Sequence, residues 1–309
     1  MTELAAALTD YLILRRSLGY KLERAGQVLA SFVTHLDLAG CDHVSVETAV
    51  AWATLPANPD SPWRAQRLGM VRSFARYLHA LDPAHEVPPP GLIPPGPGRP
   101  VPFLYSDEDV VALMAAARGV RNPLRAATLE TVVGLLAVSG LRVGEVIRLD
   151  CNDVDVGQGA LTVRNSKAGR SRVVPLHPST IEALRAYGAR RDELFPKPSA
   201  PSFFISTAGT RLRSGSLRQA FGEVLPAAGL PPRIGRCGPR LGGLRHSFAV
   251  STMLDWHRAG AEVGPNLPLL STYLGHVSPV STYWYLSASP RLLAAAADRL
   301  ENTTDRAKP

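Results

Sequence analysis

Apolar residues recur at intervals of three or four along much of this chain, which is the spacing of one face of an α-helix. In the first third of the chain this pattern covers residues 4–19, 25–40 and 64–81. Amphipathic helices of this kind are stable only when they bury their apolar faces against one another. The pattern therefore predicts a small helical bundle in this part of the chain.

A second series of helical patterns begins after residue 102. Ser106, with Asp109 three residues later, predicts an N-terminal cap for a helix over 107–118. The next helix, over 125–139, is apolar around most of its surface, which predicts a buried position, and Gly140 is expected to end it. Further helical patterns lie over 179–194, 216–229, 244–260, 267–275 and 289–301.

Two other patterns divide the chain. Between Asp153 and Leu176, short β-branched runs alternate with the turn signals GQG and KAG, which predicts a small antiparallel sheet. Residues 87–102 contain eight prolines, which favour an extended linker. We expect a helical domain over 1–86, a linker over 87–102, and a domain over 103–309. The predicted fold is mainly α with a small antiparallel β-sheet, an α+β class.

Composition narrows the function classes. The chain has 34 Lys and Arg against 26 Asp and Glu, a net charge of +8, which favours a polyanionic partner without proving one. Cys41, Cys151 and Cys237 form no CxxC pair, so neither a disulfide framework nor a zinc site is indicated. No signal-peptide pattern and no run of about 18 apolar residues is present, which predicts a cytoplasmic protein.

The third helical segment of the first domain mixes basic and aromatic residues. Such a mixture suits phosphate contacts beside a packed helix face. The alternative is a solvated helix face, where charged residues usually lie. The candidate DNA-binding residues are Arg64, Arg67, Arg72 and Arg76.

Five residues of the second domain form a candidate active site: Arg142, Lys167, Arg245, His276 and Tyr285. They lie in SGLRVGEVIRL, RNSKAGRSRVVPL, GGLRHSFAV and STYLGHVSPVSTYWYL. The order, spacing and flanks of these motifs resemble the tyrosine recombinase (phage integrase) family over roughly the last two thirds of the chain. One position departs from the family pattern, because Gly242 stands where the family usually has the first His of a His-x-x-Arg box.

The two arginines suit the chemistry of a DNA phosphodiester. Attack on phosphorus places negative charge on the non-bridging oxygens, which fixed positive groups must stabilise. The planar guanidinium groups of Arg142 and Arg245 can each donate two parallel hydrogen bonds to such oxygens. Glu145 follows Arg142 by three residues and is placed to hold its guanidinium. Each arginine taken singly could equally form a structural ion pair.

Lys167 and His276 are candidate polar groups around the same phosphate. Lys167 lies in the expected turn between two strands, where an ammonium could protonate the departing 5′-oxygen; the alternative is a solvated hairpin lysine. His276 follows Gly275 at an expected helix end. It could hydrogen-bond a phosphate oxygen, shuttle a proton, or only cap the helix.

The resemblance implies that Tyr285 is the nucleophile, because it follows His276 by the nine positions seen in the family. The residues alone do not separate Tyr285 from Tyr283 and Tyr273, although aromatic residues at helical spacing are usually packing residues. His246 could support the site through a structural hydrogen bond. It projects about 100° away from Arg245 on a helix and does not obviously replace the missing histidine.

The resemblance further implies a site-specific recombinase or integrase of phage or transposon origin, which forms a covalent 3′-phosphotyrosine without metal, cofactor or ATP. The first domain would then be the family's helical, SAM-like core-binding domain. The implied partner is a double-stranded recombination site, bound by a homotetramer or together with related recombinases, with the protein nucleoid-associated while bound. Residues 289–301 resemble the segment that docks onto a neighbouring protomer; the alternative is packing within their own domain.

Three other functions are compatible with parts of the sequence. A DNA-binding accessory protein of the same fold would have lost catalytic competence at Gly242. A topoisomerase-like enzyme would nick and reseal DNA by the same chemistry. Asp150, Asp153 and Asp155 could indicate a metal-dependent nuclease, but their close spacing differs from the distributed carboxylates of a two-metal site.

Overall fold

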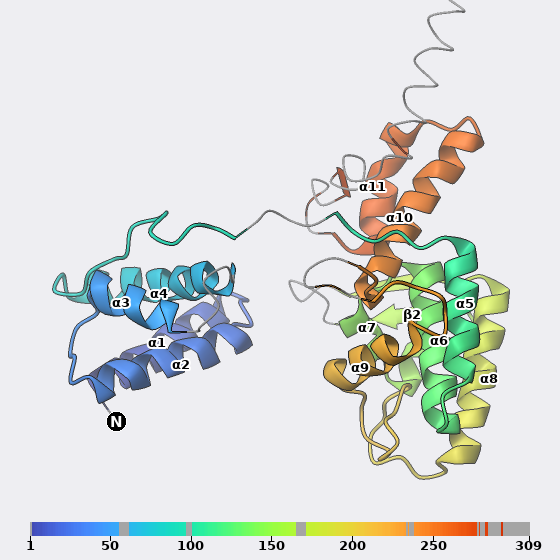
Figure 1. Cartoon of the computed structure of the whole chain (residues 1–309), viewed down its shortest axis with the longest axis horizontal. Helices are drawn as coiled ribbons and strands as arrows, with labels where there is room; N and C mark the ends of the chain where they lie inside the picture. Colours follow the sequence, from blue (N-terminus) through green and yellow to red (C-terminus); the bar gives the residue numbers. More distant parts are fainter. Residues whose placement is uncertain are drawn as a thin grey trace, which may run out of the picture. The chain divides into compact units, whose positions relative to one another are not determined.

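The chain divides into two compact units, residues 1–100 and 101–309, and the division falls inside the predicted proline-rich linker (Figure 1). The structure, a computed structural model, describes residues 2–55, 62–96, 101–164, 171–232, 234, 238–276, 278, 282, 283 and 292. Each unit has a hydrophobic core of its own. The two are therefore described separately.

The first unit is helical, as predicted. Its helices are α1 (Glu3–Ser17), α2 (Glu23–Leu38), α3 (Val46–Thr54) and α4 (Pro62–Leu81). Helix α3 was not predicted, because it is short; Ser45 and Thr48 begin it with reciprocal side-chain caps. The buried faces of the helices meet around Phe32, Trp52 and Phe74.

The second unit is built around a central helix. Its helices are α5 (Asp107–Arg118), α6 (Pro123–Ser139), α7 (Val143–Arg148), α8 (Pro178–Leu194), α9 (Ser214–Val224), α10 (Leu241–Arg258) and α11 (Val263–Leu274). Helix α6 packs against α5, α8 and α10, and buried residues lie on most of its faces. The predicted buried helix is confirmed, and so is its end at Gly140.

The predicted antiparallel sheet is also confirmed. Within the described residues, β1 (Val154–Asp155), β2 (Ala160–Val163) and β3 (Arg172–Pro175) pair in the order β1-β2-β3. Leu161 and Val174 face each other across β2 and β3 and are fully buried. The sheet thus contributes one face to the core of this unit.

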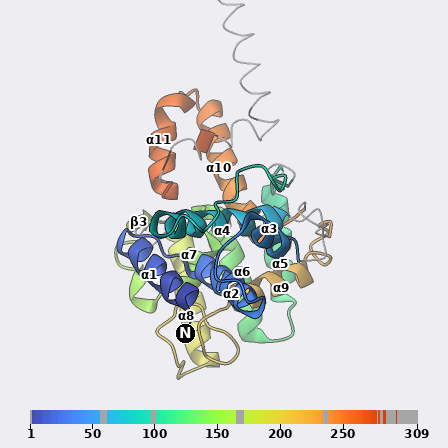
Figure 2. The ribbon, with the colours of Figure 1, turned by 90° about the vertical axis from the view of Figure 1, so that its left-hand side faces the viewer.

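Helices α10 and α11 lie side by side and share a small core of their own (Figures 1 and 2). Helix α10 begins at Leu241, three residues earlier than predicted, so Gly242 and Gly243 lie in its first turn. The predicted helix over 289–301 lies outside the described residues except for Leu292. Among the described helices, none has the length and apolarity needed to cross a bilayer.

Candidate active site

The site begins at a sharp turn after α6. Gly140 has a left-handed backbone conformation, with φ of 57°. A Cβ atom there would lie 2.5 Å from the Phe248 ring and 2.8 Å from the Leu274 side chain. Glycine is required at this position because both the conformation and the close packing exclude a side chain. The turn brings the start of α7 against α10 and α11.

Arg142 is the residue that enters α7 from this turn. Its Nη1 donates to Oε1 of Glu145 at 2.8 Å, and its backbone N–H donates to the other carboxylate oxygen at 3.0 Å. Its Nη2 donates to the carbonyl of Gly275 at 3.0 Å. The predicted contact between Arg142 and Glu145 is confirmed, and the contact with Gly275 ties Arg142 to the end of α11.

Arg172, on β3, is a site residue that the sequence interpretation missed. It donates to both oxygens of Glu145, at 3.2 and 2.9 Å, and its Nε donates to the carbonyl of Tyr273 at 2.8 Å. A signal for it exists in the sequence. Side chains two apart on a strand share a face, so Arg172 lies on the same face as the buried Val174. A charged residue on a core-facing position requires a buried partner.

That partner is Glu145, whose side chain is only 1% exposed. Burial by itself raises the pKa of this carboxyl, but the hydrogen bonds from Arg172 and Arg142 and the charge of Arg172 outweigh burial and hold the pKa at about 2. Glu145 is therefore ionised at any physiological pH. It fixes the positions of two guanidinium groups at once.

Arg245 approaches the same place from α10. Its side chain is buried, and it donates to the carbonyl of Gly140 at 2.7 Å and to the carbonyl of Leu274 at 2.8 Å. The last carbonyls of a helix lack partners within the helix and carry its negative dipole end. Here successive carbonyls each accept from a different arginine: Tyr273 from Arg172, Leu274 from Arg245, and Gly275 from Arg142. We refer to Arg142, Arg172 and Arg245 as the arginine cluster.

His276 directly follows the helix end that these arginines surround. Its backbone N–H donates to the carbonyl of Ser271 at 2.9 Å, and its Nδ1 lies 2.7 Å from the hydroxyl of the buried Thr282. These contacts fix the position and the plane of the imidazole. The structure thus brings His276 next to the arginine cluster. Its partner Thr282 precedes Tyr285 by three positions in the sequence.

Lys167 and Tyr285 lie outside the described residues. The two rival tyrosines are described. Tyr273 stacks on Phe248, with ring centroids 5.7 Å apart, and burial raises the pKa of its hydroxyl although Arg172 lowers it. Tyr283 is 52% exposed. Tyr273 is therefore a packing residue of the α10 and α11 core.

The first turn of α10 carries the position that departs from the family pattern. Gly242 is exposed, and a Cβ atom built on it would meet no other atom within 4 Å. At Gly243 the same atom would lie 2.8 Å from the Tyr105 ring. Close packing thus requires glycine at 243 and leaves room for a side chain at 242. His246 lies half-buried beside Arg245 on the same helix.

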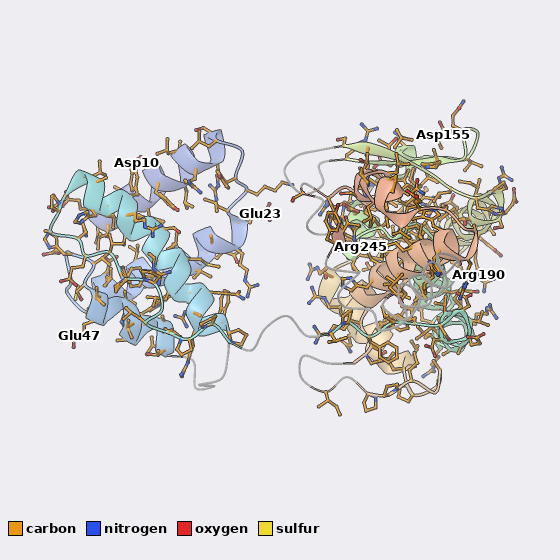
Figure 3. All side chains as sticks on the ribbon, turned by 90° about the horizontal axis from the view of Figure 1, so that it is seen from above. Asp10, Glu23, Glu47, Asp155, Arg190 and Arg245 are labelled. Carbon is orange, nitrogen blue, oxygen red and sulfur yellow. The ribbon has the colours of Figure 1, made fainter. Side chains whose placement is uncertain are left out.

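The acidic group near the sheet has a structural role in the described residues. Asp150 pairs with Arg211 at 2.5 Å, and Asp153 pairs with Arg164 at 2.5 Å. Asp153 also accepts from the backbone N–H of Asp150. Asp155 lies at the edge of the unit, as Figure 3 shows together with Arg245. The carboxylates of Asp150 and Asp153 therefore serve ion pairs and backbone caps around the short 3₁₀ turn that precedes β1, and Asp155 accepts from the backbone N–H of Gln158 at 2.8 Å in the turn after β1.

The α4 residues predicted to bind DNA lie in the first unit, and the contacts of Arg67 and Arg72 are as follows. The guanidinium of Arg67 lies 3.7 Å from the centre of the Trp52 ring, and burial lowers its pKa. Arg72 donates to the carbonyls of Pro88 and Pro89 at 2.6 and 2.9 Å. Arg76 is exposed, whereas Arg64 is half-buried. DNA contact by these residues stays a prediction.

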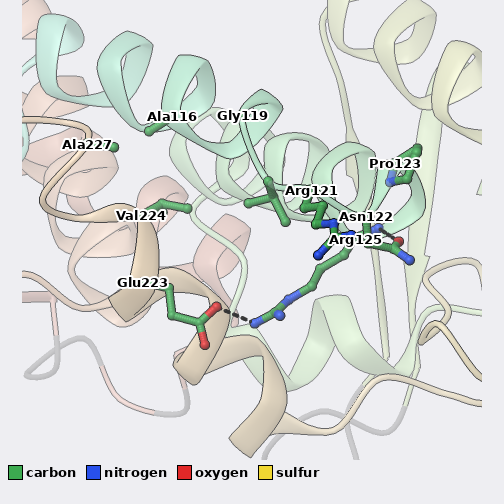
Figure 4. Close-up of a pocket in the computed structure, with 10 residues that line it drawn as sticks. Ala116, Gly119, Arg121, Asn122, Pro123, Arg125, Glu223, Val224 and Ala227 are labelled. Atoms are coloured by element: carbon green, nitrogen blue, oxygen red, sulfur yellow. Dashed lines mark hydrogen bonds and ion pairs between the residues drawn. The ribbon is translucent and has the colours of Figure 1, made fainter.

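A hollow of about 760 Å³ lies at the other end of α6, lined by the start of that helix and by residues of α5 and α9 (Figure 4). Arg125 and Glu223 pair across it at 2.6 Å. A helix of 17 residues is about 25 Å long, so this hollow is well separated from Gly140 and Arg142. It does not belong to the candidate active site.

Comparison with known proteins supplies independent evidence. The model of the phage integrase family matches residues 103–291. A Sinorhizobium fredii protein named as an integrase/recombinase, y4rB, is 41% identical over 307 residues, which cover 97% of this chain and 98% of that protein. Tyrosine recombinase XerC of Pelotomaculum thermopropionicum is 31% identical over 230 residues, which cover 72% of this chain and 69% of that protein.

Solved structures agree with the fold. One is the Tn1549 transposon integrase in complex with transposon right end DNA, with a TM-score of 0.64 and 15% identity over 97% of this chain and 100% of that one. Another is a lambda integrase tetramer bound to a Holliday junction, with a TM-score of 0.61 and 16% identity over 91% of this chain and 76% of that one. At these identities the likeness supports the fold alone.

Proposed function

The chain belongs to the phage integrase family, and from this we propose that it is a site-specific DNA recombinase that cleaves and rejoins DNA through a covalent 3′-phosphotyrosine intermediate. The observation that carries the proposal is the convergence of Arg142 and Arg245 on adjacent carbonyls of Leu274 and Gly275. Two arginines far apart in sequence thereby lie at one place, beside His276.

This arrangement suits a phosphate that gains negative charge during reaction. Guanidinium groups held by fixed partners need little reorganisation when the charge develops, and that is the main source of electrostatic catalysis. Arg142 is fixed by Glu145 and Gly275, and Arg245 is fixed by Gly140 and Leu274. We assign both arginines to the non-bridging oxygens, with His276 donating a hydrogen bond to one of them.

The proposed reaction exchanges one bond for another. The phenolate oxygen of Tyr285 attacks phosphorus, the bond from phosphorus to the 5′-oxygen breaks, and Lys167 gives its proton to that oxygen. Arginines at the phosphate would favour the phenolate of an attacking tyrosine, since opposite charges lower the pKa of a phenol. The 5′-hydroxyl of the partner strand then attacks phosphorus, gives its proton back to Lys167, and breaks the bond from phosphorus to the Tyr285 oxygen. The phosphotyrosine conserves the bond energy between the two steps, so the proposed chemistry needs neither metal nor ATP.

A second function rests on Gly242. A glycine cannot supply the side-chain donor that the family usually has there, and loss of one such donor lowers a rate by about 10²–10³. The chain would then be a slow recombinase or, at the limit, a DNA-binding accessory protein of the same fold. The contacts of Arg142, Arg245 and His276 support the first of these, because these groups are held in place in a chain that has glycine at 242.

We propose that the partner is a double-stranded recombination site bound by a homotetramer. The lambda integrase structure is a tetramer bound to a Holliday junction, which supports this assembly for a chain of the same fold. The first unit would contact DNA phosphates through α4, whose candidate residues are Arg64, Arg67, Arg72 and Arg76; Arg67 also contacts Trp52, and Arg72 also donates to the proline segment.

The test requires the cognate site first. The Tyr285→Phe variant, which is expected to bind without cleaving, selects its site from a random duplex library. A nicked suicide substrate carrying that site is then incubated with the wild-type chain, and a denaturing gel is examined for a covalent protein–DNA adduct. Tyr283→Phe is the matched control, since it removes a hydroxyl two residues away.

We expect an adduct with the wild-type chain and with Tyr283→Phe, and none with Tyr285→Phe. An adduct that persists in Tyr285→Phe would overturn the assignment of the nucleophile. Site-specific binding without an adduct from any variant would favour the accessory protein. Low-salt binding alone decides nothing, because phosphate contacts give affinity for any sequence.

A further inference from the structure

Arg172 joins three elements of the second unit. Its Nη atoms reach Glu145 on α7, and its Nε reaches the Tyr273 carbonyl at the end of α11. The side chain itself comes from β3. One guanidinium therefore connects a strand, the helix that carries Arg142, and the helix end before His276.

Arg172 is also tightly packed against the backbone at Gly275. A Cβ atom on Gly275 would lie 2.7 Å from Nη1 and 2.9 Å from Cζ of Arg172. Gly275 also has a left-handed backbone, with φ of 68°. The side chain of Arg172 is only 14% exposed. The plane of the Arg172 guanidinium is thus fixed by its hydrogen bonds to Glu145 and by its close approach to the backbone at the end of α11.

Arg142 binds one partner of Arg172, Glu145, and a carbonyl two residues after the other, at the same end of α11. Glu145 accepts from Arg142 at 2.8 Å, and Gly275 accepts from Arg142 at 3.0 Å. A displacement of Glu145 or of the α11 end would therefore displace the guanidinium that we assign to the phosphate. Displacement by about 1 Å is enough to lower a rate severalfold to a hundredfold.

We propose that Arg172 is a positioning residue for cleavage, which aligns the phosphate-binding Arg142 with the end of α11 by holding Glu145 and the Tyr273 carbonyl together. This inference rests on the proposed function. Arg172 does not touch the phosphate in it. Its contribution is the alignment of the residues that do.

Arginine is required for this role because of its geometry. Lysine keeps the positive charge but presents a single ammonium, so it cannot donate to both carboxylate oxygens and to a backbone carbonyl in one plane. Arg172→Lys therefore tests alignment with the charge retained, and Arg172→Gln removes the charge as well. The matched control is Arg164→Lys, because Arg164 follows β2 and pairs with Asp153 at 2.5 Å without contacting Glu145.

The first measurement is the rate of adduct formation per folded molecule on the suicide substrate. We expect Arg172→Lys to be severalfold to about 10²-fold slower than the wild-type chain, because misplacing a catalytic group by about 1 Å can lower a rate by that much. Arg164→Lys should cleave at the wild-type rate. A purely structural role would lower the amount of folded protein and leave the rate of the folded fraction unchanged.

The second measurement does not depend on activity. Carbon-13 NMR follows the titration of the Glu145 carboxyl, with Glu145→Gln used to identify its signal. The pKa of this carboxyl is held at about 2 in large part by Arg172. In Arg172→Gln it should rise, and the acid limb of the cleavage profile should move to higher pH with it. Arg164→Gln should leave both unchanged.

The outcomes separate the two proposals. If the wild-type chain forms the adduct while Arg172→Lys and Arg172→Gln cleave at the same rate, the positioning role is overturned and the recombinase function stands. If the wild-type chain forms no adduct, the proposed function fails, and the NMR titration then decides on Arg172. An unchanged pKa of Glu145 in Arg172→Gln overturns the inference in either case.

Discussion

In the first unit, Arg67 stacks on Trp52 and Arg72 donates to Pro88, which is 16 residues away in sequence. In the second unit, Arg142 donates to Gly275, which is 133 residues away, and Arg172 donates to Tyr273, which is 101 residues away. Both units therefore use arginine to hold parts of the chain together. They differ in how far along the chain the partners lie and in how many partners are shared.

The difference shows where a site can form. An arginine that shares its partner with no other arginine stabilises one contact, so its substitution changes stability only around that contact. In the arginine cluster, Arg142 and Arg172 share Glu145, and all three arginines share the end of α11, so each member depends on the others. Shared partners give a fixed arrangement of positive charge, and such preorganised charge is what phosphate chemistry requires.

The largest change in stability is expected from Glu145→Gln, in the second unit. The substitution leaves two guanidinium groups without their buried counter-charge, and breaking a buried ion pair on one side typically costs about 3–5 kcal/mol. The second unit should lose stability by that amount at pH 7. Hydrogen exchange followed by mass spectrometry on peptides of α6 measures it, because this method resolves the two units separately.

The stabilisation that Glu145 gives to the second unit should also depend on pH. The folded-state pKa of Glu145 is about 2 against an ordinary value of 4.5, so its stabilisation is present above pH 4.5 and is lost as the pH falls toward 2. The difference between wild type and Glu145→Gln should shrink over that window. Glu223→Gln, which removes an exposed pair with Arg125, should cost under about 1 kcal/mol. Equal losses in the two variants would refute the special role of Glu145.

A smaller effect is expected in the first unit from Arg67→Ala. The variant loses a cation–π contact with Trp52 that is partly shielded from water, worth about 1 kcal/mol. Hydrogen exchange in peptides of α2 and α3 should increase accordingly, while α6 in the second unit stays unchanged. Arg76→Ala, at an exposed position of the same helix, is the control and should change stability by less than about 0.5 kcal/mol.

The smallest change in stability is expected from Gly242→His. The position is exposed and open, and replacing glycine inside a helix is mildly favourable, so stability should change by less than about 0.5 kcal/mol. The adduct should form faster, by up to about 10²-fold, if the imidazole restores a donor to the phosphate. Gly242→Ala separates the two effects, since it gains helix stability without a ring. A rate in Gly242→His no faster than in Gly242→Ala would show that the missing histidine does not limit cleavage.

Several elements could be predicted from the sequence because their causes are local. The helix over 107–118 has its own caps, and α6 is apolar on most sides, so neither depends on distant residues for its identification. The short helices α3 and α7 were missed, since few turns leave little periodicity. Arg142 and Glu145 were paired correctly because they lie three residues apart on one helix.

The sequence was sufficient to predict the family, the helical and antiparallel patterns, and the candidate residues Arg142, Lys167, Arg245, His276 and Tyr285, because these depend on local spacing and on motifs in a fixed order. Which groups meet could be seen only in the folded chain.

The tertiary structure showed that arginines at the start of α7, on β3 and on α10 converge on the end of α11, and that Arg172 is one of them. The physical reason is that unpaired carbonyls and a buried carboxylate select their partners in space. Such contacts do not depend on how far apart the partners lie along the chain, and local patterns in the sequence do not reveal them.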